Sequence, residues 1–201
     1  MGERVIERRT DPRCLRTRAM LQAALSELMG SRSFERISIA QIADAATLNR
    51  ATFYDHYADK FALLDDLVAA RFNDLLARRG VAFDGGCNRA LPATILAVCD
   101  YLASTPWTGP ADRPQDQSHF EAAVVTVVRR TLLAGMRRCT EELARSSEML
   151  ASAASWAMYG AAKTWLSWPD RGASEDVVGA IAATVSPILA QASWLHEEPA
   201  A

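Results

Sequence analysis

The feature that most restricts the fold is a pair of very short helical segments between two longer ones near the start of the chain. Asp11 and Pro12 suit the N-cap and the first turn of a long helix that should end near Gly30. Ser38, followed by Gln41 three residues later, predicts a capping box at the start of a second helix. Because that helix has room for only about two turns, it must pack against the longer helices to be stable.

A third short helix follows at once. Ala45 to Leu48 form the turn before it, Asn49 is a good N-cap, and Asp59 caps a long fourth helix. Phe53 and Tyr57 have the spacing to point back into the core. Two short helices joined by a tight turn and held by flanking helices present the second of them to the major groove of DNA. The sequence therefore predicts a helix-turn-helix unit.

Helical spacing of apolar residues continues through most of the remaining sequence, so we expect an all-α fold. Further helices are expected over 89–104, 117–143, 147–168 and 174–194, with breaks at 81–87 and 104–117. Half of the 201 residues are hydrophobic and 23% are charged, which is typical of a soluble globular protein. No apolar run reaches the length of a membrane span and no signal peptide is evident, so we expect no membrane partner and a cytoplasmic location.

The net charge of −2 does not favour binding to nucleic acid, but the distribution of charge along the chain does. Residues 1–80 hold 13 Lys and Arg against 11 Asp and Glu, whereas residues 81–201 hold 9 against 13. Six basic residues form an N-terminal arm before and at the start of the first helix: Arg4, Arg8, Arg9, Arg13, Arg16 and Arg18. This arm is either a solvated tail or a segment that lies along phosphates or reaches a minor groove.

The third helix carries side chains suited to reading DNA. Arg50 can pair with guanine through two hydrogen bonds. Tyr54, His56 and Lys60, the last at the start of the fourth helix, suit phosphate oxygens. Each of these three also has a plain structural interpretation, as a core aromatic or an ordinary surface residue. The exposed face of the helix should include Asn49, Arg50, Thr52, Tyr54 and His56.

The segments 18–28, 38–46 and 49–64, with Phe34 between the first two, carry a family pattern whose most specific part is Thr52-Phe53-Tyr54-x-His56-Tyr57-x-x-Lys60. Over about residues 15–68 the chain resembles the N-terminal domain of the TetR/AcrR family of bacterial regulators. The resemblance implies a sequence-specific DNA-binding regulator of transcription, by the family's usual mode a repressor released by a small-molecule effector. It places DNA contacts at Ser38, Ile39 and Ala40 in the supporting helix, and at Arg50, Ala51, Thr52, Tyr54, His56 and Lys60.

Two positions depart from the family's pattern. Thr47 stands in the turn where the family commonly has glycine, and Ser33 stands where glycine often precedes Phe34. Because glycine is favoured at positive φ, Thr47 predicts either a strained residue or a slightly different turn.

The same resemblance implies that the rest of the chain binds an effector and forms a homodimer, which matches a palindromic operator. We therefore divide the chain into an N-terminal arm and helix-turn-helix DNA-binding domain (1–60), a connecting helix (61–80) and a helical effector-binding and dimerisation domain (81–201).

The C-terminal helices hold large aromatic and aliphatic side chains, each of which has an alternative interpretation as core. The predicted dimer interface consists of Trp165, Trp168, Val177, Ile181, Val185 and Ile188. The predicted effector pocket has His119 and Tyr159 as polar contacts and is otherwise mostly apolar, which favours an apolar or aromatic effector. Its candidate residues are Cys99, Tyr101, Leu102, Trp107, His119, Phe120, Val124, Val127, Met136, Trp156 and Tyr159.

Other classes of function have weaker support. The sequence has no G-x-S-x-G, no glycine-rich phosphate loop and no obvious nucleophile and base pair, so we expect neither an enzyme nor a cofactor. Cys14, Cys87, Cys99 and Cys139 are far apart, with no histidine at metal-ligand spacing. They predict reduced thiols and no metal site, with a redox sensor as the alternative. The rival function is a helical adaptor that binds proteins and has no role on DNA.

Overall fold

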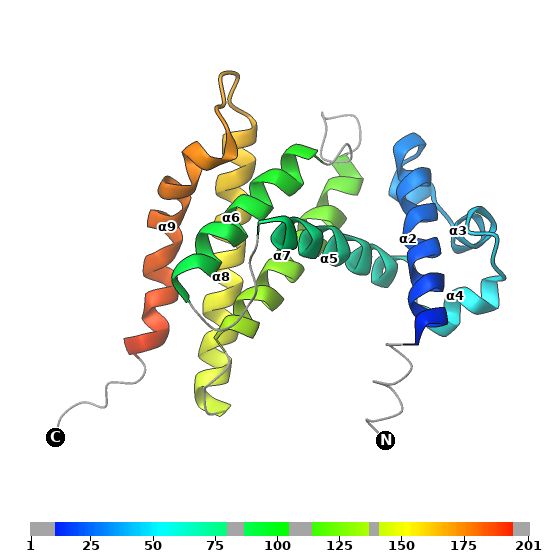
Figure 1. The fold of residues 1–201 in the computed structure, drawn as a ribbon, viewed down its shortest axis with the longest axis horizontal. Helices are drawn as coiled ribbons and strands as arrows, with labels where there is room; N and C mark the ends of the chain where they lie inside the picture. The colour runs from blue at the N-terminus through cyan, green and yellow to red at the C-terminus, as the bar shows by residue number, and fades with distance from the viewer. Residues whose placement is uncertain (1–10, 80–86, 105–113, 137–140, 195–201) are drawn as a thin grey trace. The chain divides into compact units, whose positions relative to one another are not determined.

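The structure is a computed structural model that describes residues 11–79, 87–104, 114–136 and 141–194, and these residues form helices joined by turns (Figure 1). The predicted all-α fold is confirmed. The chain divides into two compact units. The first contains the described residues up to Leu67 and the start of α7 up to His119, and the second contains the others.

The first unit contains α2 (Pro12–Ser31), the short 3-10 turn η1 (Phe34–Arg36), α3 (Ile39–Ala45), α4 (Arg50–His56) and the start of α5 (Lys60–Arg78). α2 begins as predicted, because the Asp11 carboxylate accepts a hydrogen bond from the Arg13 backbone N–H at 2.8 Å. α2 packs against both α3 and α4. Their shared core includes the buried side chains of Leu21, Leu25, Phe34, Ile42, Phe53 and Leu63.

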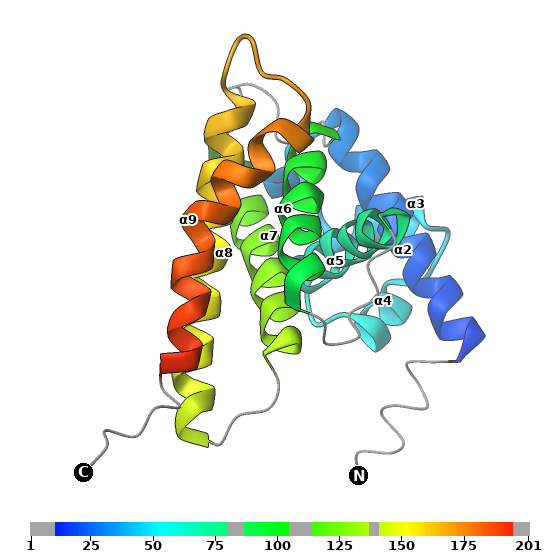
Figure 2. The ribbon, with the colours of Figure 1, turned by 60° about the vertical axis from the view of Figure 1, so that its left-hand side comes forward.

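The second unit contains the rest of α5 and α7 (Pro114–Gly135), with α6 (Cys87–Ser104), α8 (Glu141–Leu166) and α9 (Ser174–Trp194). α8 and α9 lie side by side and antiparallel, and α6 packs against both (Figures 1 and 2). The buried side chains that these helices share include Ile95, Val98, Ala154, Met158, Ala162, Ile181 and Val185.

The predicted helix over 117–143 is wrong at its C-terminal end. α7 ends at Gly135, and the Met136 N–H donates to the carbonyl oxygens of Leu132 and Leu133 at 3.1 and 3.2 Å. Glycine weakens a helix because it gives up more backbone freedom on folding than other residues, so Gly135 is the residue in the sequence that indicates this end. α8 then begins at Glu141, six residues before the predicted start at 147. Most of the expected breaks at 81–87 and 104–117 lies outside the described residues, but the prediction is wrong at their edges, because Cys87 begins α6, Ser104 ends it, and residues 114–117 already belong to α7.

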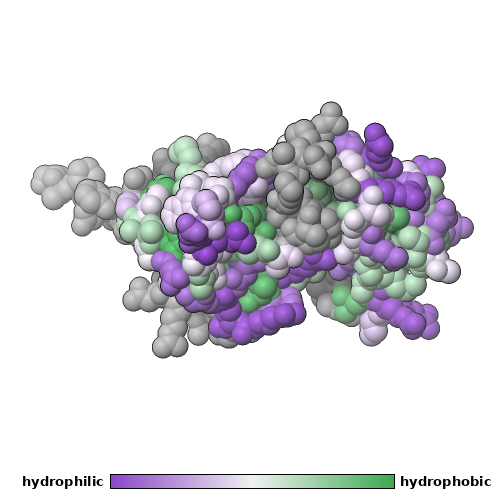
Figure 3. All heavy atoms as spheres, turned by 90° about the horizontal axis from the view of Figure 1, so that it is seen from above, coloured by the Kyte–Doolittle hydropathy of each residue, from purple (hydrophilic) through white to green (hydrophobic). Residues whose placement is uncertain are grey.

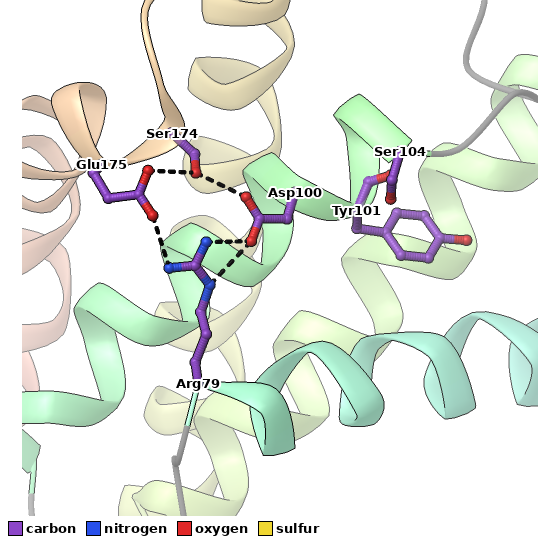
Figure 4. Close-up of polar contacts among 6 residues, drawn as sticks. All are labelled: Arg79, Asp100, Tyr101, Ser104, Ser174 and Glu175. Carbon is purple, nitrogen blue, oxygen red and sulfur yellow. Dashed lines mark hydrogen bonds and ion pairs between the residues drawn. The ribbon is translucent and has the colours of Figure 1, made fainter.

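A polar network that no motif in the sequence indicates joins three helices of the second unit (Figure 4). Arg79, directly after α5, donates from Nε to Asp100 of α6 at 3.0 Å and from Nη1 to Glu175 of α9 at 3.1 Å. The Ser174 hydroxyl donates to the other Asp100 oxygen at 2.7 Å. Burial alone would lower the pKa of Arg79, but hydrogen bonds to both carboxylates outweigh it and raise that pKa. The network fixes the end of α5 against α6 and α9.

The surface combines hydrophilic and hydrophobic areas. On the face drawn in Figure 3, hydrophobic side chains lie in small areas separated by hydrophilic ones. Three large hydrophobic side chains of α8 and the turn after it, Met149, Trp156 and Trp168, are more than half exposed. Among the helices that the structure describes, none has the combination of length and hydropathy that a membrane span requires.

Candidate nucleic-acid interface

The helix-turn-helix is built by side-chain caps at the predicted positions. The Ser38 hydroxyl accepts from the Gln41 N–H at 3.2 Å, and the Gln41 side chain accepts from the Ser38 N–H at 2.9 Å. This is the predicted capping box, and it starts α3. The Asn49 side chain accepts from the Ala51 N–H at 2.9 Å and starts α4. Each short helix thus begins with hydrogen bonds between residues that are only two or three positions apart in the sequence.

The turn between α3 and α4 is a Schellman motif with a threonine in the glycine position. The Leu48 N–H donates to the Ala43 carbonyl at 2.9 Å, and the Thr47 N–H donates to the Asp44 carbonyl at 3.0 Å. Thr47 has φ of 57°, a left-handed conformation that a side chain with a Cβ adopts at a cost. Of the two alternatives that the sequence left open, the strained residue is confirmed. Ser33, the other departure, has an ordinary φ of −63°.

The inward side of α4 packs into the core of the first unit. Phe53 is fully buried and Tyr57 is 5% exposed, as predicted. The Tyr57 hydroxyl donates to the Asp66 carboxylate at 2.5 Å, and Arg18 and Gln22 of α2 donate to the same carboxylate at 2.5 and 2.7 Å. Asp66 therefore links α2, α4 and α5.

The contacts around Asp66 affect its pKa and change one expectation, the role of Arg18. Burial raises the pKa of Asp66, but the hydrogen bonds from Tyr57 and Arg18 outweigh it, so the pKa lies below its ordinary value. Arg18 was counted among the basic residues of the arm, yet its guanidinium is paired with Asp66 inside the unit. Arg13 and Arg16 are exposed, and Arg4, Arg8 and Arg9 lie outside the described residues.

The outward side of α4 carries the predicted reading residues. Asn49, Arg50 and Ala51 are exposed, Tyr54 is 48% exposed, and Thr52 is half-buried. Arg50 Nη2 donates to the Tyr54 hydroxyl at 3.0 Å, so these two side chains lie together one helical turn apart. In α3, Ser38 and Ala40 are exposed and Ile39 is half-buried. The structure thus brings an arginine, a tyrosine and polar groups together on one side of a short helix.

Two of the predicted contact residues have partners within the first unit. His56 is half-buried, and its Nδ1 lies 3.5 Å from Sγ of Cys14 in α2. Lys60, expected to bind phosphate, donates instead to the backbone carbonyl oxygens of Phe34, Glu35 and Ile37. The phosphate contact of Lys60 stays a prediction. No signal near Lys60 in the sequence indicates these acceptors, since they lie more than twenty residues earlier in the chain.

The residues predicted for an effector pocket fall into several groups. Cys99, Tyr101 and Leu102 of α6 are buried in the second unit, as are Phe120, Val124 and Val127 of α7 and Tyr159 of α8, while Met136 is half-buried. Trp156 is 51% exposed. His119 belongs to the first unit, where its Nε2 lies 2.6 Å from Oε1 of Glu35. Trp107 lies outside the described residues.

Burial differs across the predicted dimer interface too. Trp165, Val177, Ile181 and Val185 are all at most 7% exposed in a single chain. The chain's own helices already cover these four side chains, and their role in a dimer interface stays a prediction. Trp168 is 52% exposed and Ile188 is half-buried.

The thiols and other potential metal ligands offer little chemistry. Burial raises the pKa of Cys99 to about 11, which makes its thiol a poor nucleophile at neutral pH. Cys14 is a free, half-buried thiol. Among the described residues, no group of three His, Cys, Asp or Glu side chains lies close enough together to hold a metal ion.

Comparison with known proteins supports the interpretation of the first unit. Residues 21–67 match the model of a family described as bacterial regulatory proteins, tetR family. An uncharacterized HTH-type transcriptional regulator of Bacillus subtilis (strain 168), YxbF, is 40% identical over 68 residues, which are 33% of this chain and 18% of that protein. The chain therefore matches less than a fifth of that relative's length.

The fold of the larger part of the chain is also known. A TetR transcriptional regulator from Rhodococcus sp. RHA1 has a crystal structure that aligns with 87% of this chain and 97% of its own. The TM-score is 0.53 and the sequences are 17% identical. At that identity the likeness concerns the fold alone.

Proposed function

We propose that this chain, whose residues 21–67 match the model of the tetR family of bacterial regulatory proteins, is a sequence-specific DNA-binding regulator of transcription. The observation that carries the proposal is the capped helix-turn-helix over 38–56, which lies within the segment that matches the family model. Its outward face holds Asn49, Arg50 and Tyr54.

α4 is the proposed reading helix. A helix of this kind inserts in the major groove, where a bidentate arginine contact to guanine is the most common specific one. Arg50 is exposed at the first position of α4, and its guanidinium lies over the Tyr54 ring at 5.6 Å from the ring centre. This contact restricts the directions that the guanidinium samples before DNA binds. We assign base reading to Arg50, with Asn49, Thr52 and His56 as further contacts, and with Ser38, Ile39 and Ala40 of α3 near the backbone.

The second unit is the proposed dimerisation and effector-binding part. Met149 and Trp156 are 70% and 51% exposed and lie seven residues apart, so they share one face of α8. Large apolar side chains that remain exposed in one chain are typical of surfaces that another protein covers. We propose that this face of α8 pairs with a second copy of the chain, which would give two reading helices for a palindromic operator.

An effector would act through this dimer. A ligand changes DNA affinity only if it binds one dimer geometry better than another. Phe120, Val124 and Val127 are buried and share one face of α7, so a ligand that inserted among them would be apolar or aromatic. We propose release of a repressor from DNA as the mode of control, with the cytoplasm, where the DNA is, as the location.

Selection of bound duplexes from a random pool, followed by fluorescence anisotropy on the selected duplex, tests the proposal. The expected result is one preferred two-fold symmetric site and an affinity that falls steeply with salt, because cationic side chains displace counterions from the phosphates. An adaptor that binds only proteins would select no sequence and would show no salt-dependent binding to any duplex.

A further inference from the structure

Asp66 lies in the second turn of α5, and its carboxylate accepts hydrogen bonds from both α2 and the end of α4. Arg18 of α2 contacts both carboxylate oxygens, from Nη2 to Oδ1 at 2.5 Å and from Nε to Oδ2 at 3.2 Å. Gln22, one turn further along α2, donates to Oδ2 at 2.7 Å. The hydroxyl of Tyr57, the C-cap of α4, donates to Oδ2 at 2.5 Å. We call these four residues the Asp66 cluster.

Arg18 holds the Asp66 carboxylate in one orientation. A forked contact from a guanidinium to both oxygens fixes the plane of a carboxylate as well as its position. Both side chains are only 24% exposed, so solvent screens this pair less than a surface pair. Arg18 also lies over the Tyr57 ring, with its central carbon 5.6 Å from the ring centre. The guanidinium therefore orders the acceptor and the donor of the next bond.

The direction of the hydrogen bond between Tyr57 and Asp66 follows from the charge of the carboxylate. Burial raises the pKa of Asp66, but the hydrogen bonds from Tyr57 and Arg18 outweigh it, and the pKa is lowered. Burial and the bond to Asp66 raise the pKa of Tyr57. At neutral pH the carboxylate is therefore ionised and can only accept, and the Tyr57 hydroxyl keeps its proton and donates it.

This bond determines where the C-terminal end of α4 lies. α4 has seven residues, and a helix that short depends on contacts outside itself. Its N-terminal end has the Asn49 cap. Towards its other end Phe53 is buried in the core, but an apolar contact has no preferred direction. The Tyr57 hydroxyl, one residue after the end of α4, meets an oxygen whose position and orientation are fixed.

We propose that Asp66 is a positioning residue of the reading helix, which takes its own orientation from Arg18 and fixes α4 through the Tyr57 hydroxyl. The proposal rests on the proposed DNA-binding function of α4. A hydrogen bond to a base edge needs a narrow range of distance and angle, whereas attraction between charges and phosphates does not depend on sequence. A small displacement of α4 therefore weakens binding to the operator more than binding to DNA in general.

The test starts from two variants of the full chain that each remove one hydrogen bond to the same carboxylate oxygen. Tyr57→Phe removes the hydroxyl and keeps the buried ring. Gln22→Met is the matched control, because the bond that it removes joins α2 to α5 and does not involve α4. Anisotropy is measured on the selected operator and on an unrelated duplex, at a temperature at which circular dichroism shows each variant folded. Amide hydrogen exchange is measured on the free proteins.

A double-mutant cycle decides whether Tyr57 acts through Asp66. Asp66→Ala removes the acceptor, and Tyr57→Phe is measured alone and in this background. The change in net charge is present in both members of the second pair, so it cancels. Should Asp66→Ala not fold, Asp66→Asn takes its place, because a neutral amide oxygen is a weaker acceptor than a carboxylate.

For Tyr57→Phe we expect operator affinity to fall about tenfold, because the hydroxyl donates to a charged acceptor. Affinity for the unrelated duplex should change by less than about twofold, and amide exchange should become faster within α4. Gln22→Met should lower the melting temperature as Tyr57→Phe does, but should leave operator affinity within about twofold of the wild type. In the Asp66→Ala background, Tyr57→Phe should cause no further loss of operator affinity.

Two results would overturn the proposal. A loss that is equal on both duplexes, or that persists in the Asp66→Ala background, would mean that the Tyr57 hydroxyl affects DNA binding independently of Asp66. Equal operator affinities of Tyr57→Phe and Gln22→Met would reduce the Asp66 cluster to a stabilising contact. If the wild type binds no duplex, the proposed function is wrong, and amide exchange in free Tyr57→Phe still decides whether the Asp66 cluster orders α4.

Discussion

Replacing Thr47 by glycine should stabilise the first unit, although it removes a side chain. Thr47 has φ of 57° and is exposed, so the substitution relieves backbone strain and loses little packing. A left-handed conformation costs a residue with a Cβ about 1–2 kcal/mol. The greater freedom of glycine in the unfolded chain offsets about 0.5–1 kcal/mol of that gain. The net effect should be an increase of about 0.5–1 kcal/mol in the free energy of unfolding.

Urea unfolding and thermal melting followed by circular dichroism measure this change. For a unit of this size we expect a melting temperature higher by about 2–8 °C. Thr47→Ala is the matched control, because it keeps the Cβ and hence the strain, and its effect should stay within about 0.5 kcal/mol. Both Schellman hydrogen bonds come from backbone groups, so affinity for the operator should be unchanged. Equal stability of the glycine and alanine variants would refute the argument from strain.

Three further predictions address reading, pH and assembly. Arg50→Ala should weaken operator binding by about 1–3 kcal/mol and relax the preference at one base pair per half-site; anisotropy with single-base operator variants measures both, and an unchanged preference would mean that another residue reads that base. Asp66→Asn should lower the free energy of unfolding at neutral pH. Since the folded-state pKa of Asp66 is lowered, the difference in the free energy of unfolding between this variant and the wild type should be present above about pH 4. It should disappear as the pH falls through the folded-state pKa. Urea titrations over that range measure the difference, and a constant difference would contradict the prediction. Trp156→Glu should give a folded monomer in light scattering, whereas Val185→Glu should unfold the second unit because Val185 has no exposed surface; a dimeric Trp156→Glu would move the interface elsewhere.

The parts of the helix-turn-helix that the sequence predicted are those whose hydrogen bonds are local. Asp11, Ser38, Asn49 and Asp59 each cap a helix by accepting from a backbone N–H two or three residues later. A bond of that kind depends on little beyond the residue type and its spacing. The strain at Thr47 was predictable for the same reason, because a Schellman turn needs a left-handed residue at one position.

The parts that the sequence could not predict depend on distant partners. Asp66 accepts from side chains nine to forty-eight residues away, and the acceptors of Lys60 precede it by more than twenty residues. Nothing in the spacing of either residue distinguishes a structural role from a solvated or DNA-binding one. Only the packing of α2 and η1 against the start of α5 brings these groups together.

The predicted dimer interface shows how one helical pattern has two interpretations. Val177, Ile181 and Val185 repeat every four residues, which predicts a buried stripe but not what buries it. In the structure α6 and α8 pack on α9 and bury these side chains, so helices of the same chain cover the regular stripe. The residue that departs from this arrangement is Trp156, which is 51% exposed on a helix whose Ser155 and Met158 are fully buried. A second copy can cover only what the first leaves exposed, and for that reason the test of assembly belongs on Trp156 and not on the stripe.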